Sequence, residues 1–410
     1  MSPTHNRPLI IFILGALSTI SPFAIDMYLS AFPQMAVALD TTTARISLSL
    51  SSYFAGLAAG QLMYGPLLDR FGRKRPLYAG LGLFVLASLA CLLARNVEWL
   101  VGWRFVQAVG GCAAGVAAMT MVRDFFPARE TAKIISMLIL VISASPMLAP
   151  SIGTFVSERW GWQCVFLVLS AFVLLMMAVT AWVLPDGYEP DRSVELRPLP
   201  ILRNYAAVLK EPQFLTYALA GAFAFAGLLV YVASSPIVFM EVFHVSAKQF
   251  GAIFAGLSVG FIGSNQINIL LLKKYSSERI FLGAMLLVCP AALLLLAGTL
   301  LGWFGLWSTL VLLFVILSAL GLSAPNGSAL ALVPFDHNIG SAASMLGFLQ
   351  IGVAGLASAC IGVFDSHSLM PVALVMAVTS WIGLAILLFG RTRVKQLRFV
   401  EEKNTHPLAH

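Results

Sequence analysis

Charged side chains are scarce in this chain. Asp, Glu, Lys and Arg together make up 10% of its 410 residues, whereas hydrophobic residues make up 59%. A typical soluble domain contains about 25% charged residues. A soluble protein of this length could not cover its surface with so few charges. The composition therefore excludes a water-soluble domain and predicts a chain that crosses a bilayer several times.

Residues that build metal, disulfide and catalytic sites are equally scarce. The five cysteines lie within apolar stretches without metal-type spacing, and the six histidines lie in predicted tails, loops or segment ends. No Gly-rich phosphate-binding loop of the Walker type occurs. No catalytic constellation can be assembled from the remaining side chains. We therefore expect no metal, no other cofactor, no direct coupling to ATP and no enzyme activity.

Basic residues outnumber acidic ones and give a net charge of +7. A nucleic-acid-binding surface would gather Lys and Arg on one solvated face together with aromatic residues. Here the basic residues stand in short groups between apolar runs. We therefore expect these charges to set the topology in a lipid bilayer, and we expect no nucleic-acid partner.

Apolar segments long enough to span a membrane divide the chain. A helix needs about 20 apolar residues to cross a hydrocarbon core of about 30 Å. Twelve such segments are predicted, at 9–37, 44–68, 77–95, 99–124, 131–157, 161–184, 213–240, 247–272, 278–301, 306–333, 338–364 and 369–390. The predicted fold class is an all-α membrane protein with twelve transmembrane helices.

The spacing of the segments indicates a duplicated bundle. Six segments form an N-terminal half at 1–184, and six more form a C-terminal half at 213–410 that ends in a short tail. The charged, proline-containing stretch 185–212 between them is predicted to be a cytoplasmic linker with a short surface helix at about 199–210. Transporters are often built from such halves, with the substrate site at the interface between them.

The loop charges predict the orientation. If the N-terminus is cytoplasmic, 20 of the 25 Lys and Arg residues lie on the cytoplasmic side. The opposite side then holds only Arg45, Arg95, Arg159 and Lys248. This asymmetry follows the positive-inside rule and predicts that both termini are cytoplasmic.

Two ionisable side chains lie deep within predicted segments, Asp26 in the first and Arg104 in the fourth. A charge at the centre of a membrane helix costs at least about 2.5–3.5 kcal/mol, so it usually faces an interior cavity. We interpret Asp26 as a site for a proton, a cationic substrate, or each in turn. The alternative is a structural Asp that is satisfied by Arg104 or by backbone groups freed beside Pro22.

Arg104 and Gln107 lie three residues apart and therefore share a helix face. The pair can support a buried network directed toward Asp26, or Arg104 can extend outward to lipid headgroups. In the fifth segment, Pro146 and Pro150 lie on one face and Gly153 follows them. A helix weakened in this way suits a gate, and a static kink is an equally good interpretation.

Aromatic and polar residues elsewhere are candidates for the wall of a substrate cavity, although ordinary helix packing explains each aromatic residue as well. With Asp26, the candidates are Tyr28, Tyr53, Phe225, Tyr231 and Gln350.

The loop after the second segment reads Gly65-Pro66-Leu67-Leu68-Asp69-Arg70-Phe71-Gly72-Arg73-Lys74-Arg75. It resembles the signature loop of the major facilitator superfamily, a family of twelve-helix transporters. The resemblance implies a conformational latch in which Arg73 pairs with Asp124. Asp69 would accept hydrogen bonds from the helix N-terminus at Gly340 and Ser341. It also implies proton coupling by the Arg104-Phe105-Val106-Gln107 stretch, and an antiporter motif at Ser145-Pro146, Pro150 and Gly153.

Further stretches resemble the bicyclomycin-resistance group of drug:proton antiporters: Ile25-Asp26-Met27-Tyr28-Leu29, Val122-Arg123-Asp124 and Ser234-Ser235-Pro236. The resemblance implies a monomeric exporter in a bacterial inner membrane that exchanges protons for a small amphipathic molecule. Two alternatives stay open at this stage. One is a proton-coupled porter for a metabolite such as an amino acid or nucleoside, and the other is a membrane sensor or scaffold that transports nothing.

Overall fold

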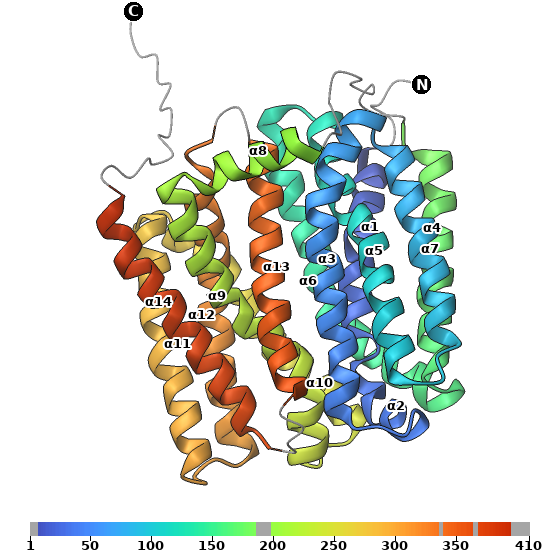
Figure 1. Ribbon diagram of the computed structural model, residues 1–410, viewed down its shortest axis with the longest axis vertical. Coiled ribbons are helices and arrows are strands. Elements are labelled where there is room, and N and C mark those ends of the chain that lie inside the picture. The colour runs from blue at the N-terminus through green and yellow to red at the C-terminus, as the bar shows by residue number, and fades with distance from the viewer. Residues whose placement is uncertain (1–6, 186–197, 336–338, 364–367, 395–410) are drawn as a thin grey trace, which may run out of the picture.

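A computed structural model describes residues 7–185, 198–335, 339–363 and 368–394. These residues form helices and no strands (Figure 1). The first group of elements is α1 (Arg7–Asp26), η1 (Leu29–Ala31), α2 (Phe32–Ala38), α3 (Thr43–Phe71), α4 (Lys74–Leu92), α5 (Val97–Phe125), α6 (Ala128–Trp160) and α7 (Gln163–Val183). The remaining elements are α8 (Pro198–Leu209), α9 (Pro212–Pro236), η2 (Ile237–Val242), α10 (Ala247–Leu271), α11 (Ser277–Leu300), α12 (Leu306–Leu332), α13 (Ile339–Val363) and α14 (Met370–Arg393).

Each of the twelve predicted segments coincides with a long helical stretch in the described residues. Ten of these stretches are long and apolar enough to cross a membrane, including α1 together with α2 and α9 together with η2. Helices α3 and α6, with 29 and 33 residues, are not among the ten but pack within the same bundle. The all-α membrane fold is therefore confirmed, and the count of twelve spans stays a prediction.

The long helices form two groups that lie side by side, α1–α7 and α9–α14 (Figure 1). Helix α13 packs against both α9 and α3, so it joins the two groups. The surface helix predicted at 199–210 is present as α8, which contacts α9 and α13. The part of the predicted linker at 186–197 lies outside the described residues, and the exact division into halves stays a prediction.

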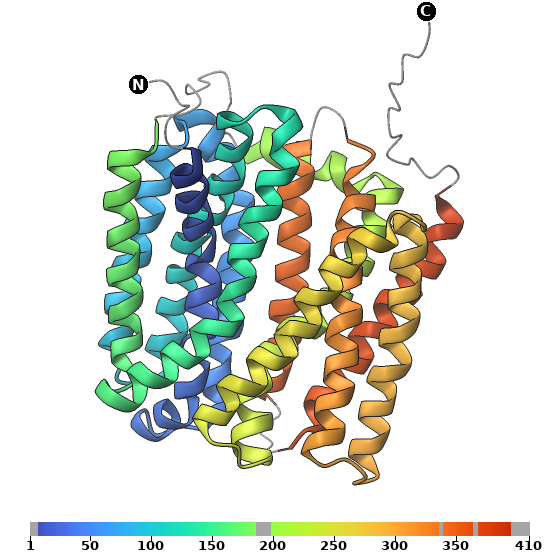
Figure 2. The same cartoon turned by 180° about the vertical axis from the view of Figure 1, so that it is seen from behind.

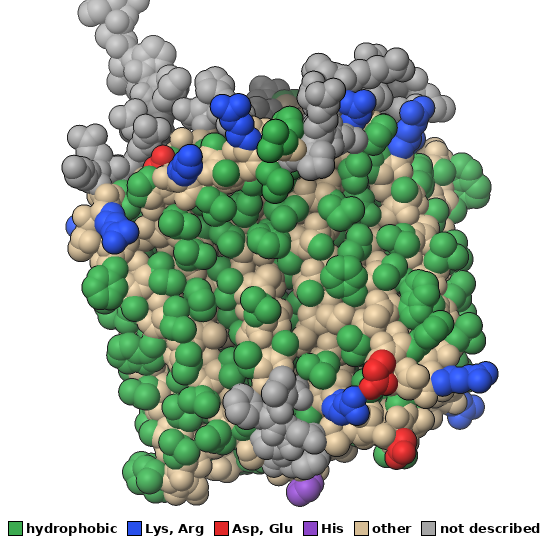
Figure 3. Space-filling view, viewed as in Figure 1, with side chains coloured by type: hydrophobic (Ala, Val, Ile, Leu, Met, Phe, Trp, Pro, Cys, Tyr) green, Lys and Arg blue, Asp and Glu red, His purple; other side chains and the backbone are tan. Residues whose placement is uncertain are grey.

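The two ends of the bundle differ in charge. Helix α1 begins and α14 ends at the same end, which also carries the α3–α4, α5–α6 and α10–α11 connections (Figure 1). We call it the basic end, because Lys and Arg residues are concentrated there (Figure 3). Its basic residues in the described chain include Arg7, Arg70, Arg73, Lys74, Arg75, Arg123, Arg203, Lys210, Lys273, Lys274, Arg279, Arg391 and Arg393.

The two groups meet closely at the end opposite the basic end. Helices α6 and α10 converge there and diverge toward the basic end (Figure 2). The short helix η1 contacts both α9 and α10 in the same region. This arrangement closes the bundle at one end and leaves the groups further apart at the other.

Small residues allow the central helices of the first group to approach closely. A Cβ atom added at Gly56 of α3 would overlap the Phe105 carbonyl oxygen and lie 2.8 Å from the Ala108 Cβ of α5. A Cβ at Gly80 of α4 would likewise lie 2.8 Å from the carbonyl oxygen of Gly110 in α5. Helix α5 therefore packs against α3 and α4 through backbone contacts, which fixes its position in the bundle.

The tight contact at Gly56 predicts the effect of a single methyl group. We expect Gly56→Ala to reduce stability by about 1–3 kcal/mol, the usual cost of overpacking. Gly82→Ala is the matched control, since a Cβ at this helical glycine meets no atom within 4 Å. Thermal unfolding of the detergent-solubilised variants measures both effects. Equal melting temperatures for the two variants would contradict the proposed packing.

Candidate functional site

The first predicted segment, 9–37, is not one continuous helix. Helix α1 ends at Asp26, a turn follows, and the chain continues through η1 into α2. Pro22 lies in the last part of α1 and Pro33 lies in the first turn of α2. Pro22 has no N–H to donate to the preceding turn, whereas Pro33 suits the start of a helix. The predicted segment 9–37 is thus present as a helix with a break, and the break places Asp26 at a helix end.

The Asp26 carboxylate is buried at this break, with 4% of the residue exposed. It accepts one long hydrogen bond, from the Ser145 hydroxyl of α6 at 3.4 Å. Among the described residues, no Lys or Arg nitrogen forms an ion pair with it within 4.0 Å. The alternative in which Arg104 pairs directly with Asp26 is therefore wrong for this structure.

Arg104 of α5 is fully buried and binds the backbone close to Asp26. One guanidinium nitrogen donates to the carbonyl oxygen of Ala24 at 2.9 Å, and another donates to the Gln107 side chain. Gln107 in turn donates to the hydroxyl of Ser88 in α4 at 2.6 Å. The network joins α4 and α5 to the last turn of α1, so it fixes the helix end that carries Asp26.

Two tyrosine rings complete the surroundings of Arg104. The guanidinium carbon lies 4.3 Å from the centre of the Tyr28 ring and 4.1 Å from that of Tyr53. Both tyrosines are fully buried, and the Tyr28 hydroxyl lies 3.1 Å from that of Ser49. Aromatic faces attract a cation most strongly when water is excluded. Arg104 is thus held inside the bundle and does not extend to lipid headgroups.

Helix α6 lies directly against the break in α1. Gly153 packs so closely on Met27 that an added Cβ would overlap the Met27 carbonyl oxygen. Ser145, eight residues earlier, supplies the hydrogen bond to Asp26. Pro146 and Pro150 lie between these two contacts and remove two backbone donors from α6. The proline–glycine motif therefore faces the broken part of α1.

A second cluster of charges lies at the basic end. Arg73 donates to Asp124 at 2.7 Å and to Asp69 at 2.8 Å, and it is 5% exposed. Burial lowers the pKa of Arg73, but the hydrogen bonds to Asp124 and Asp69 outweigh it, so the pKa lies above the usual value. The predicted contact between Arg73 and Asp124 is present, and Arg73 stays charged at any physiological pH.

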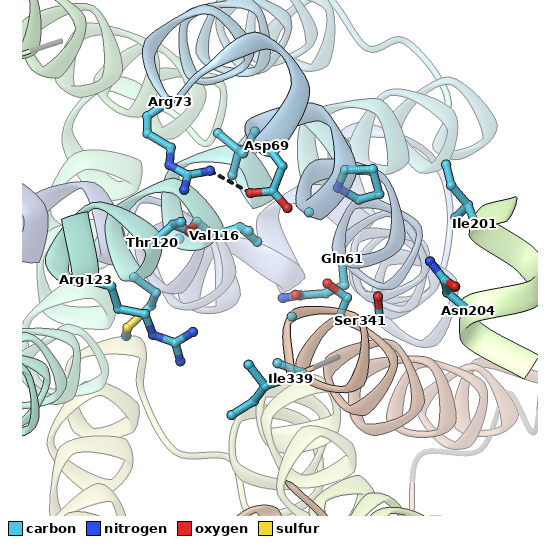
Figure 4. Close-up of a pocket in the computed structure, with 18 of the residues that line it drawn as sticks. Gln61, Asp69, Arg73, Val116, Thr120, Arg123, Ile201, Asn204, Ile339 and Ser341 are labelled. Atoms are coloured by element: carbon cyan, nitrogen blue, oxygen red, sulfur yellow. Dashed lines mark hydrogen bonds and ion pairs between the residues drawn. The ribbon is translucent and has the colours of Figure 1, made fainter. Parts of the chain in front are cut away.

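A cavity of about 990 Å³ opens at the basic end, between the two groups of helices. Asp69 and Ser341 lie on opposite walls of this cavity, with Thr120 and Arg123 on a third side (Figure 4). Its walls include Gln61 and Asp69 of α3, Val116, Thr120 and Arg123 of α5, Ile201, Asn204 and Tyr205 of α8, and Ile339, Gly340 and Ser341 of α13. The predicted contact of Asp69 with the N-terminus of α13 is not formed, because the cavity separates them.

The other candidates for the cavity wall lie in the second group of helices. The Tyr231 ring of α9 stacks on Phe254 at 5.6 Å, and its buried hydroxyl has no hydrogen-bond partner. The Gln350 amide of α13 donates to the Ser328 hydroxyl at 3.1 Å. Phe225 is half-buried against the apolar core. A substrate-binding role for these residues, and for Tyr28 and Tyr53, stays a prediction.

Sequence reasoning missed Ser88, Ser145 as a partner of Asp26, and the Ala24 carbonyl group. Each belongs to a different helix from the side chain that it contacts. Serines are common in this chain, and no spacing within one segment relates Ser88 to Gln107. Only the packing of α4 and α5 reveals that contact.

A bundle of long apolar helices that is closed at one end, has a cavity at the other and buries an acid at a helix break is the arrangement of a membrane transporter. The chain belongs to the major facilitator superfamily, whose family model matches residues 14–359. It is therefore a multi-pass membrane transporter and not an enzyme.

Individual relatives match over almost the whole chain. The chain is 31% identical to an uncharacterized MFS-type transporter, YdgK, of Bacillus subtilis, covering 96% of this chain and 98% of the relative. It is 28% identical to a bicyclomycin resistance protein homolog of Haemophilus influenzae, with the same coverage. It is also 28% identical to the multidrug resistance protein MdtL of Shigella flexneri, covering 92% of this chain and 95% of the relative.

A solved structure has the same fold. It is a bacterial homolog of the human lysosomal transporter Spinster in an inward-facing and unoccupied conformation. The TM-score is 0.67 at 14% sequence identity, and the match covers 95% of this chain and 96% of the other.

The contact between Arg104 and Tyr53 predicts the outcome of a matched pair of substitutions. The Tyr53 hydroxyl forms no hydrogen bond of good geometry, so Tyr53→Phe keeps the interaction and changes stability by less than about 1 kcal/mol. Tyr53→Leu removes the aromatic face and costs about 2 kcal/mol or more. Thermal unfolding in detergent separates these outcomes. A Phe variant as unstable as the Leu variant would show that the ring face is not what matters.

Proposed function

We propose that this protein exports small, amphipathic, drug-like molecules in exchange for protons. Membership of the superfamily supports transport, and the names of the Haemophilus and Shigella relatives support a drug-like cargo. The observation that carries the exchange with protons is Asp26, a buried acid at a helix break that pairs with no Lys or Arg of the described chain.

The orientation follows from the basic end. Cytoplasmic loops of membrane proteins carry an excess of Lys and Arg, so the basic end faces the cytoplasm of a bacterial cell and the protein lies in the inner membrane. Both termini are then cytoplasmic, and the cavity beside Asp69 opens to the cytoplasm. In this orientation the structure corresponds to the state that collects its cargo inside the cell.

The proton site is Asp26. A charged carboxylate in an apolar interior is costly without a cation or several hydrogen bonds. Asp26 has one long hydrogen bond, so we assign the protonated acid to this cavity-open state. Cargo that enters between the two groups of helices promotes release of the proton to the cytoplasm. The charged acid then favours the opposite state, in which cargo leaves and a new proton binds.

Arg104 and Gln107 act as positioning residues in this scheme. Their hydrogen bonds reach Ala24 and Ser88 and do not reach the carboxylate itself. They hold the end of α1 in place while Asp26 changes its charge. Gly153 of α6 packs on this fixed helix end, so we assign the movement to α6, which Pro146 and Pro150 weaken.

The cargo site lies between the two groups, which correspond to residues 1–184 and 213–410. Asp26, Phe225, Tyr231 and Gln350 are the residues that we assign to it, with Tyr28 and Tyr53 behind them around Arg104. Apolar and aromatic walls with few polar groups suit flat amphipathic molecules. The protein works as a monomer, since each chain contains both groups.

The latch acts in the state opposite to the one described. When the cavity closes, the Asp69 carboxylate reaches the N-terminus of α13 at Gly340, where helix dipole and free N–H groups stabilise an anion. Arg73 and Asp124 hold Asp69 in place for this contact. The latch thus stabilises the state that is closed to the cytoplasm.

Asp26→Asn tests proton exchange directly. Cargo binding to the purified wild-type protein is expected to release protons, and Asp26→Asn is expected to abolish that release and the transport driven by a pH gradient. Asp40→Asn is the matched control, because Asp40 is exposed and its positive φ of 48° is well tolerated by Asn. If the Asp26→Asn variant still released protons on cargo binding and still transported cargo in a pH gradient, Asp26 would not be the proton site.

Asp69→Asn tests the latch. Loss of the charge should weaken the closed state by about 1 kcal/mol, or about fivefold in its population. We expect a cysteine introduced at Thr120, in the cavity wall, to react faster with a water-soluble maleimide in the Asp69→Asn background. Glu98→Gln at the opposite end serves as the control. Equal labelling rates in the Asp69→Asn and Glu98→Gln backgrounds would exclude the latch.

A further inference from the structure

Helix α8 is attached to the bundle by one face only. Tyr205 and Val208 are buried, and the Tyr205 hydroxyl donates to the Leu62 carbonyl oxygen of α3 at 3.0 Å. Burial raises the pKa of Tyr205, and a hydrogen bond with Ser344 of α13 opposes that shift. Tyr205 therefore ties α8 to α3, and α8 also contacts α13 at the basic end of the bundle (Figure 1).

A second face of α8 is apolar and, in the described part of the chain, largely exposed. Leu199 is 77% exposed and Leu202 is 62% exposed, and the face continues through Ala206 and Leu209. The spacing of three, four and three residues places these four side chains in one row along the helix. We call this row, Leu199, Leu202, Ala206 and Leu209, the outer stripe.

The outer stripe points away from the transport cavity. Residues advance by about 100° along a helix, so Leu202 and Asn204 point in directions about 160° apart. Asn204 lines the cavity together with Ile201 and Tyr205. The outer stripe therefore lies on the side of α8 that faces away from the cavity.

Positive charges border the outer stripe. Arg203 follows Leu202 and Lys210 follows Leu209, and both are exposed. Neither forms an ion pair with an acidic residue of the described chain. From Pro198 to Lys210 there is no Asp or Glu. An apolar row beside unpaired cations is typical of helices that lie in the interface of an anionic membrane.

We propose that the outer stripe docks α8 onto the lipid leaflet at the basic end, with Arg203 and Lys210 on anionic phospholipid headgroups. The stripe enters the boundary between headgroups and acyl chains, and the two cations lie at its aqueous edge. A stable protein partner usually covers about 800 Å² on each side. A single row on a twelve-residue helix is narrow for such a partner and fits a lipid surface.

Depth-dependent quenching tests this docking in the full-length protein. Cys164 and Cys360, the described cysteines that are not buried, are replaced by Ser, and one new cysteine is placed at Leu202 or at Asn204. Each variant carries an environment-sensitive fluorophore and is reconstituted in vesicles of phosphatidylethanolamine and phosphatidylglycerol. Some vesicles contain a lipid with a nitroxide near its glycerol end.

We expect the label at 202 to show a blue-shifted emission and at least about twofold stronger quenching than the label at 204. Equal quenching at the two positions would overturn the proposal. The emission at 202 could instead change with the protein-to-lipid ratio and not with the nitroxide lipid. That result would assign the outer stripe to contact with a second copy of the chain, and it would also overturn the proposal.

The role of the two cations is tested separately with Arg203→Gln and Lys210→Gln combined. Quenching at 202 should fall in vesicles that contain phosphatidylglycerol and stay unchanged in vesicles of phosphatidylcholine. An equal loss in both vesicles would mean that the residues act through the fold of α8. No loss in either would exclude headgroup recognition. Each of these two results contradicts the proposed contact with anionic lipid.

Discussion

The placement of one buried guanidinium determines much of this structure. Arg104 lies inside an apolar bundle, where an unpaired charge is costly. Its partners are a carbonyl oxygen, an amide oxygen and the faces of two tyrosine rings, and none of them is an acid. The carbonyl belongs to Ala24, two residues before the end of α1. The need to solvate Arg104 therefore ties α5 to the broken end of α1, and this end carries Asp26.

This constraint explains how a single acid can act between two groups of helices. Asp26 lies next to the fixed backbone, and no ion pair with Arg104 fixes its charge. On its other side, Ser145 and Gly153 of α6 contact the break. Helix α6 in turn contacts α10 of the second group at the closed end. A charge change at Asp26 would therefore act where the two groups meet.

Much of the fold could be predicted from the sequence, because the cost of burying charge and backbone in lipid is local. The positions of the long helices, the surface helix α8 and the depth of Asp26 and Arg104 follow from apolar runs and their interruptions. The contact of Arg73 with Asp124 followed from a family resemblance. The break after Asp26 and the tyrosine rings around Arg104 could not be predicted, since they depend on contacts between distant segments. The separation of Asp69 from Gly340 across the cavity could not be predicted either, since the sequence does not tell which end of the bundle is open.

In the mechanism that we propose, the proton on Asp26 decides which end of the bundle is open. Spin labels at Met137 of α6 and Ile269 of α10, both exposed, report how far these helices diverge toward the basic end. In the wild-type protein, raising the pH should shift the distance distribution from long to short separations as Asp26 loses its proton. Asp26→Asn, which resembles the protonated acid, should keep the long separation at every pH. A distribution that shifts with pH in the Asn variant as it does in the wild type would show that the proton on Asp26 does not control the opening.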